Sequence, residues 1–157
     1  MTADARCIVH GPGEGEIVLI PDGRQFLFKT VGKDTAGAYS LGEFVLPPGG
    51  AALPHIHWGN DEAYYVLDGE FTVGVGEQSV IARAGSFVLV PRGTVHSLRN
   101  GGTRPGKLLF VISPAGMERM FVEIGQILSA RDLPPDRAAI QAIRDKYRTQ
   151  DVGEMAF

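Results

Sequence analysis

The chain has 157 residues, of which 44% are hydrophobic and 21% charged, and its formal net charge is −3. This composition is typical of a globular protein with one hydrophobic core. No cluster of Lys and Arg favours nucleic-acid binding, and no apolar run approaches the roughly 18 residues of a membrane-spanning helix. The single cysteine, Cys7, excludes an intramolecular disulfide. The first residues lack the pattern of a signal peptide, so we expect a cytoplasmic protein.

Glycine and proline are frequent, at 21 and 10 residues, which favours many short strands joined by turns. Residues 1–16 have turn chemistry and no hydrophobic period, and we expect a flexible leader. Residues 87–90 are all apolar, which predicts a strand buried on both faces. The sequence pattern predicts the following series of strands: 17–20, 25–30, 39–46, one around His55 and His57, 62–67, 70–75, 78–82, 86–90, 96–99 and 107–112.

The sequence changes character after Pro114, because residues 116–129 and 136–148 are predicted to form helices. A dense series of short strands followed by two helices predicts an all-β fold, an antiparallel sandwich or barrel with short C-terminal helices. We expect a single domain with the strands in residues 17–115. Residues 116–157 would then be a helical tail that packs on the barrel.

Three histidines and one glutamate are the candidates for metal binding. His55 and His57 are two residues apart, so in an extended strand both point to the same face. Residues 58–61 have the composition of a turn, after which Glu62 begins the next strand. His96 lies in a second segment further along the chain. Imidazoles with one carboxylate suit Fe, Mn, Ni, Co, Cu or Zn better than Ca or Mg, which prefer oxygen ligands.

The two segments that hold these residues resemble the paired signature motifs of the cupin superfamily. The first family motif runs Gly, five residues, His-x-His, three or four residues, Glu, six residues, Gly, and it is matched by Gly49, His55, His57, Glu62 and Gly69. The second runs Gly, five residues, Pro-x-Gly, two residues, His, three residues, Asn, and it is matched by Gly85, Pro91, Gly93, His96 and Asn100. The resemblance covers roughly residues 36–115. It implies a small single jelly-roll barrel, similar to the quercetin-dioxygenase-like monocupins.

Together with the residue chemistry, the resemblance implies one divalent transition metal bound by His55, His57, Glu62 and His96. Four protein ligands on an octahedral metal leave two positions open, which a substrate and a second small molecule need. A metal that only stabilises the barrel is the alternative, although the set lacks the cysteines of a closed structural zinc site. The motif glycines, Pro91 and Asn100 are interpreted as turn-forming residues.

Other side chains are expected near the metal because they share a face with a ligand or follow the barrel on the first helix. Tyr64 shares a face with Glu62, and its phenol could hydrogen-bond a substrate. Core packing is the alternative interpretation for Tyr64 and for every other member of this group. The expected pocket-lining residues are Phe44, Leu46, Val66, Leu98, Phe110, Met117 and Phe121.

For function, the resemblance implies a metal-dependent dioxygenase that acts with O₂ on a small apolar or aromatic enol or phenol. Glu62 could take the substrate proton in that reaction. One alternative is a non-oxidative isomerase, cyclase or lyase in which the metal and Glu62 stabilise an enolate. Another is a cupin that binds a small molecule without turnover. The resemblance also implies a homodimer, and no nucleic-acid or membrane partner is expected.

Overall fold

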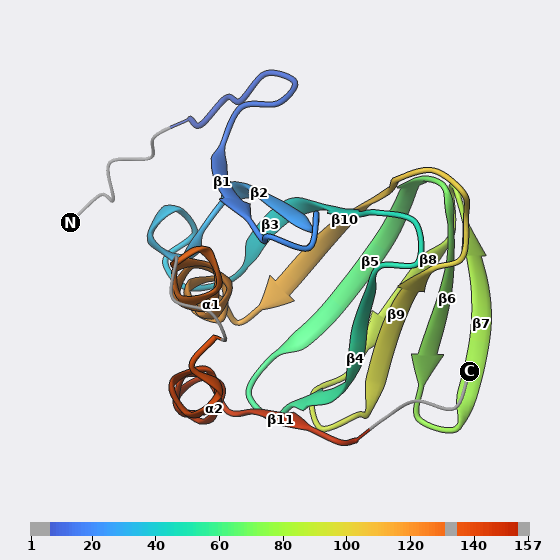
Figure 1. The fold of residues 1–157 in the computed structure, drawn as a ribbon. Helices are drawn as coiled ribbons and strands as arrows, with labels where there is room; N and C mark the ends of the chain where they lie inside the picture. The colour runs from blue at the N-terminus through green and yellow to red at the C-terminus, as the bar shows by residue number, and fades with distance from the viewer. Residues whose placement is uncertain (1–6, 131–134, 154–157) are drawn as a thin grey trace.

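The computed structural model describes residues 7–130 and 135–153, which form two antiparallel β-sheets and two α-helices (Figure 1). The six-stranded first sheet contains, in spatial order, β1 (Glu16–Leu19), β2 (Gln25–Thr30), β3 (Ser40–Leu46), β10 (Gly106–Ser113), β5 (Asp61–Asp68) and β8 (Phe87–Val90). The five-stranded second sheet contains β11 (Thr149–Asp151), β4 (Ala51–His57), β9 (His96–Asn100), β6 (Glu70–Val75) and β7 (Gln78–Arg83). The sheets face each other around one interior, and the predicted all-β, antiparallel jelly-roll fold is confirmed.

The core occupies the space between the sheets because inward and outward residues alternate along each strand. In β3 the inward residues Phe44 and Leu46 are buried, whereas Val45 between them is partly exposed. Five phenylalanines meet at one end of this core, and the Phe26 and Phe44 rings stack with their centroids 4.2 Å apart. Each such aromatic pair contributes about 0.5–1.5 kcal/mol beyond the burial of its surface. The members of this cluster are Phe26, Phe28, Phe44, Phe110 and Phe121.

The two predicted helices are confirmed as α1 (Glu118–Ser129) and α2 (Arg137–Lys146), and a short 3₁₀ helix spans Gly32–Asp34. Asp136 caps α2, since its side chain accepts a hydrogen bond of 2.9 Å from the Ala139 backbone. Phe121 lies on α1 and packs against the other phenylalanines of this cluster, so the helix contacts the barrel core. Among the described residues, no helix has the length and apolarity needed to cross a membrane. The division into leader, barrel and tail at residues 16 and 115 stays a prediction.

The prediction for residues 87–90 was wrong, because β8 is buried on one face only. Phe87 and Leu89 are 64% and 55% exposed, whereas Val90 is buried. The apolar run suggested a central strand, but β8 is the edge strand of the first sheet and its outward face has no cover. A continuous apolar stretch does not distinguish these two positions.

The helical tail predicted for residues 116–157 also needs correction, because the chain forms a strand after α2. Arg148 adopts a left-handed backbone with φ of 54°, which reverses the chain. β11 then pairs antiparallel with β4, and Thr149 lies opposite His57. The backbone N–H of Trp58 donates to the carbonyl of Arg148 over 3.0 Å and extends this pairing. The residues after α2 therefore form hydrogen bonds with the outer edge of β4, whose backbone groups would otherwise be unpaired.

Asn100 and Gly69 show why the motif turns need particular residues. Asn100 is 1% exposed, and its amide donates to the carbonyls of Leu46, Pro47 and Arg104 over 2.9, 3.2 and 2.9 Å. Gly69 has φ of 93°, and a β-carbon there would lie 3.0 Å from the α-carbon of Gly106. Both residues join the ends of strands, as the sequence predicted.

Candidate metal centre

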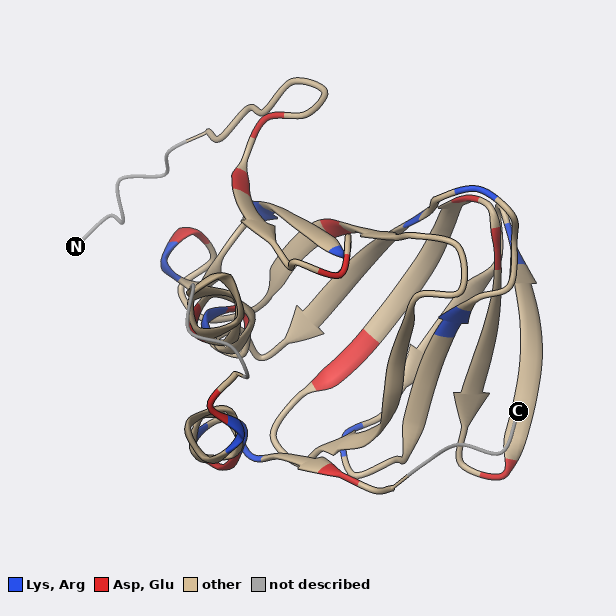
Figure 2. Ribbon diagram, in the orientation of Figure 1, with Lys and Arg blue, Asp and Glu red and all other residues tan. Residues whose placement is uncertain are grey.

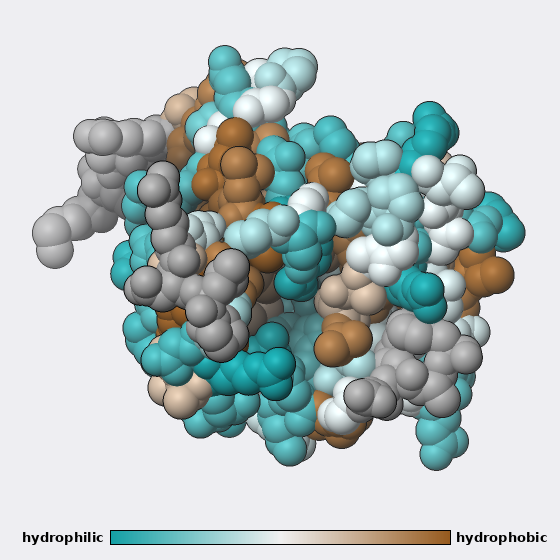
Figure 3. All heavy atoms as spheres, in the orientation of Figure 1, coloured by the Kyte–Doolittle hydropathy of each residue, from teal (hydrophilic) through white to brown (hydrophobic). Residues whose placement is uncertain are grey.

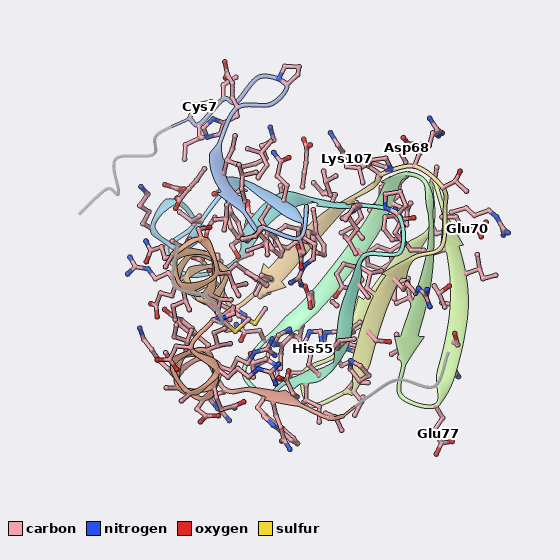
Figure 4. The ribbon with its side chains drawn as sticks, viewed as in Figure 1. Cys7, His55, Asp68, Glu70, Glu77 and Lys107 are labelled. Atoms are coloured by element: carbon pink, nitrogen blue, oxygen red, sulfur yellow. The ribbon has the colours of Figure 1, made fainter. Side chains whose placement is uncertain are left out.

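The four predicted ligands come from both sheets and meet inside the barrel. His55 and His57 lie at the end of β4, His96 begins β9, and Glu62 lies near the start of β5. His55 and His96 are direct partners in the β4–β9 pairing. One ligand atom from each of the four residues lies within 4.8 Å of the others. Figure 4 labels His55 inside the barrel, and Figure 3 shows a hollow with a hydrophilic floor at the same place in the view.

Three of the four side chains are almost entirely removed from solvent, with His57, Glu62 and His96 at 3%, 6% and 2% exposure. The Nε2 atoms of His55 and His57 are 3.1 Å apart. One carboxylate oxygen of Glu62 lies 3.1 Å from Nε2 of His96 and 3.4 Å from Nε2 of His57. All three imidazoles therefore direct Nε2 toward a common centre.

The opposite nitrogen of each ring determines which tautomer is present. Nδ1 of His55 lies 2.6 Å from the carbonyl of Leu53, and Nδ1 of His96 lies 3.0 Å from the carbonyl of Thr94. A carbonyl oxygen can only accept a hydrogen bond, so we assign the proton to Nδ1 in both rings. Each neutral ring then has a lone pair on Nε2, which is the form that binds a metal.

His57 differs from His55 and His96 because a side chain, and not a backbone carbonyl, lies beside its Nδ1 atom. Oγ1 of Thr149 lies 2.9 Å away, and Thr149 is 2% exposed. With Nδ1 as the donor, Nε2 of His57 also offers a lone pair to the centre. Thr149 lies 92 residues after His57 and was not predicted from the sequence. Only the β4–β11 pairing brings them together, and no local pattern predicts that pairing.

Burial and the neighbouring charges shift the pKa values of these candidate ligands. Burial, together with the positive charges of His96 and His57, lowers the pKa of His55 to about 3. Burial opposes ionisation of Glu62, but hydrogen bonds from His57 and His96 outweigh it and lower its pKa. Burial also opposes protonation of His96, yet its hydrogen bond to Glu62 raises its pKa. Glu62 is therefore ionised and His55 neutral at neutral pH.

The four residues fit a divalent transition metal. The Nε2 atoms of three imidazoles and a carboxylate oxygen face one another at hydrogen-bond distances, and a metal that binds there displaces the protons that these atoms share. Mixed nitrogen and oxygen donors suit first-row transition metals. The free Cys7 is exposed and is not a member of this group, so no thiolate contributes.

Tyr64 is the next inward residue after Glu62 on β5, and it is 4% exposed. Burial, the negative charge of Glu62 and the hydrogen bond between them raise the pKa of Tyr64 well above its ordinary value. The phenol is therefore protonated and able to donate a hydrogen bond. Tyr64 and Glu62 thus form a donor and acceptor pair beside the candidate centre.

The residues that were expected to line a pocket lie in the hydrophobic core. They fill the barrel around and beyond the four ligands, so core packing accounts for their burial, and substrate contact stays a prediction for each. These residues are Phe44, Leu46, Val66, Leu98, Phe110, Met117 and Phe121. A groove of about 820 Å³ is lined by His96 together with Thr72, Ser97 and Arg99. Thr72, Ser97 and Arg99 alternate along their strands with the inward-facing Val73 and Leu98.

Hydrogen bonds between Arg92 and Asp61 connect the turns of the two motifs. The backbone N–H of Arg92 donates to Asp61 over 2.9 Å, and its guanidinium donates twice more over 3.0 and 2.8 Å. Asn60 donates to the carbonyl of Pro114 over 2.6 Å. These bonds fix the start of β5, and with it the position of Glu62.

Comparison with known proteins agrees with this geometry. Residues 42–112 match the cupin domain family. The chain is 32% identical over 74 residues to the tetracenomycin polyketide synthase protein TcmJ of Streptomyces glaucescens, covering 47% of this chain and 50% of that protein. It is 27% identical over 129 residues to quercetin 2,3-dioxygenase of Bacillus subtilis, covering 82% of this chain and 38% of that protein.

A solved structure with a similar fold is an RmlC-like cupin from Shewanella frigidimarina. The two share 22% identity with a TM-score of 0.62, over 73% of this chain and 96% of that chain. The matched part of the chain spans about half the length of the curated relatives, from 38% of the dioxygenase to 59% of the protein SchB of Streptomyces halstedii. The region that matches the cupin domain family, residues 42–112, contains both motifs.

Proposed function

This chain belongs to the cupin superfamily, and from that premise we propose that it is a metal-dependent dioxygenase acting on a small apolar or aromatic enol or phenol. The proposed ligands are His55, His57, Glu62 and His96. The observation that carries the proposal is the convergence of three Nε2 atoms and one ionised carboxylate inside the barrel. A transition metal held by these four residues would supply Lewis-acid and redox chemistry.

The protein's own groups would bind the substrate and move its proton. Glu62 is ionised and can take the proton from a substrate hydroxyl, as a general base must. Tyr64 is protonated and can donate a hydrogen bond to Glu62 or to the resulting oxygen anion. This pair would hold a deprotonated enol or phenol in one orientation, so that the oxidation occurs at a defined carbon.

The apolar surroundings of Glu62 support the proposed substrate class. Ile112 and Val90 are its direct neighbours on the two adjoining strands, and both are buried. Such walls favour an apolar ring and exclude water, which strengthens every charge interaction at the centre. The similarity to quercetin 2,3-dioxygenase, which extends over 82% of this chain, supports the same class.

A second candidate function is a non-oxidative isomerase, cyclase or lyase reaction on a small molecule. The Glu62–Tyr64 pair favours it, because a carboxylate that can accept a proton lies beside a phenol that can donate a hydrogen bond, and neither role needs an oxidant. The similarity to a polyketide synthase protein is consistent with this candidate. Both candidates use the same four ligands and differ only in their need for O₂.

The test is the metal content and O₂ uptake of protein purified without chelator, with a panel of flavonols and other enols. We expect about one transition metal per chain and substrate-dependent O₂ uptake. His57→Ala should lose both, whereas His10→Ala, which alters an exposed histidine outside the site, should keep both. Turnover without O₂ uptake would favour the second candidate, and binding without turnover would favour a binding protein. A wild-type protein free of metal would overturn the proposal.

A further inference from the structure

An ion pair from α2 and β11 lies at the edge of the candidate metal centre. Asp151 of β11 lies directly opposite His55 in the β4–β11 pairing, two residues after Thr149. The hydroxyl of Thr149 contacts the ring of His57, so this face of β11 is the face on which the candidate ligands lie. Because side chains two residues apart point to the same face of a strand, Asp151 points to the same side as His55.

Arg144 of α2 is the partner of Asp151. Its guanidinium donates a hydrogen bond to the Asp151 carboxylate, and the two side chains are 29% and 50% exposed. A molecule from solvent can therefore reach both groups. A guanidinium carries several N–H donors and a carboxylate carries two acceptor oxygens, so both groups can bind a further molecule besides each other. We call Arg144 and Asp151 the rim pair. Figure 2 shows its acidic member on β11.

The rim pair lies on the side from which the centre can be reached. Of the four candidate ligands only His55 is partly exposed, and the other three are buried. His55 is also the ligand that lies opposite Asp151. In the common view of Figures 1 and 3, the hollow opens between the two helices and β4. A molecule that approaches the centre past His55 therefore passes the rim pair.

The position of α2 does not depend on the rim pair alone. Lys146 and the hydroxyl of Tyr147 donate to Glu123 of α1 over 2.8 and 2.7 Å. Ile143 and Tyr147 also pack against the hydrophobic core. An exposed ion pair contributes little to stability, so loss of Arg144 should leave the fold intact.

We propose that the rim pair binds ring hydroxyls of the substrate, and that the substrate is a neutral aromatic enol or phenol with further hydroxyl groups away from the metal. This inference rests on the proposed function, because it assumes that one substrate oxygen binds at the four ligands. A hydroxyl can donate to Asp151 and accept from Arg144. A carboxylate or phosphate in that place would be repelled by Asp151, and an apolar ring would form no hydrogen bond with either residue.

The rim pair lies outside the part of the chain that matches the cupin domain family. That part ends at residue 112, whereas α2 begins at Arg137 and β11 at Thr149. The four candidate ligands lie within it. In this proposal, residues shared with the family perform the reaction, and residues particular to this chain select the molecule that reacts.

Isothermal titration calorimetry without O₂, on protein purified without chelator, tests the proposal with two flavonols. Kaempferol and 3-hydroxyflavone share the enol, but only kaempferol carries further ring hydroxyls. Wild type should bind kaempferol at least about 10-fold more tightly than 3-hydroxyflavone. Arg144→Ala should weaken kaempferol binding by at least about 10-fold and leave 3-hydroxyflavone binding within about twofold of wild type.

The matched control is Arg137→Ala, which removes an exposed arginine at the other end of α2 and should bind both flavonols as wild type does. Arg144→Lys keeps the charge but not the planar guanidinium, so its kaempferol affinity should fall between wild type and Arg144→Ala. Circular dichroism and metal analysis establish that each variant is folded and holds as much metal as wild type. Arg144→Gln replaces Arg144→Ala if the latter does not fold.

Equal affinity of wild type for the two flavonols, or binding of neither, would overturn the proposal. So would an Arg144→Ala protein that binds kaempferol as tightly as wild type. An equal loss in Arg137→Ala would also overturn it, because net charge and not contact would then explain the effect. O₂ uptake decides the proposed function separately, since a preference for kaempferol that depends on Arg144 but brings no O₂ uptake would refute the dioxygenase and support the rim pair.

Discussion

At the scale of single residues, the three imidazoles are oriented in two different ways. Backbone carbonyls hold Nδ1 of His55 and His96, so no substitution of a neighbouring side chain can remove these acceptors. Nδ1 of His57 depends on the hydroxyl of Thr149 alone among the bonds described for it. The orientation of His57 is therefore the one that a single mutation can test.

Thr149→Val replaces this hydroxyl with a methyl group of similar size. We expect the metal affinity to fall by about 10–100-fold, the usual effect of losing the partner that orients a metal-binding histidine. Thr149→Ser keeps the hydroxyl and should bind metal nearly as tightly as wild type. Competition titration against a chelating dye measures both affinities. Equal affinity in the valine and wild-type proteins would show that Thr149 does not orient His57.

At the scale of strands and turns, Asn100 connects segments that are distant in the sequence. Its amide donates to three carbonyls, and its side-chain oxygen accepts from the backbone of Gly102 over 2.9 Å. The end of β3 and the end of β9 are joined by these bonds. Because Asn100 is buried, water cannot replace them when they are removed.

Asn100→Ala is therefore expected to lower the free energy of unfolding by about 2–3 kcal/mol, since buried carbonyls lose their donors. Urea denaturation, monitored by tryptophan fluorescence, measures the loss. The variant should still bind one metal per chain when folded, because Asn100 acts on the turn and is not a ligand. A change below about 0.5 kcal/mol would contradict the structural role that we assign to this residue.

The strands also differ in how well they could be predicted from the sequence. The ligand set was predictable because His55 and His57 alternate on one strand and because the motif spacing is distinctive. The β8 prediction failed, since the apolar residues 87–90 do not reveal whether a strand lies at an edge. Residues 149–151 gave no signal, because three mostly polar residues form β11 only through pairing with β4. Contacts between residues distant in the sequence determine both the edge position of β8 and the formation of β11.

At the scale of the whole molecule, the proposed metal would join the two sheets. Glu62 belongs to the first sheet, whereas His55, His57 and His96 belong to the second. A ligand that binds only the folded state stabilises it, by about 2.7 kcal/mol when the free metal is about 100 times its dissociation constant. Chelation should therefore lower the melting temperature, by roughly 5–10 °C for a chain of this size.

Calorimetry of metal-loaded and EDTA-treated protein, at one protein concentration, measures this shift. His57→Ala serves as the control, because a site with a missing ligand should show little response to EDTA. An identical melting temperature with and without metal in wild type would mean that the ion does not bind at the junction of the two sheets.

The ion-pair cluster on the outer face of the first sheet predicts a pH dependence of stability. A hydrogen bond from Lys107 is the main cause that lowers the pKa of Glu43, burial opposes it, and the charges of Lys107 and Lys29 lower it further. A carboxyl with a lowered folded pKa adds stability above its unfolded pKa and loses it as the pH falls through the folded pKa. Glu43 thus stabilises the protein at neutral pH and not in strong acid.

Glu43→Gln should therefore be less stable than wild type at about pH 7, by roughly 0.5–1 kcal/mol, as expected for a largely shielded ion pair. The difference should shrink as the pH falls toward about 2, because Glu43 becomes protonated first in the unfolded and then in the folded protein. Adding 1 M NaCl at neutral pH should also reduce it, because salt screens the charges. Chemical denaturation of both proteins at the two pH values, at one protein concentration, provides the measurement. A difference that persists in acid would mean that packing, and not charge, makes Glu43 stabilising.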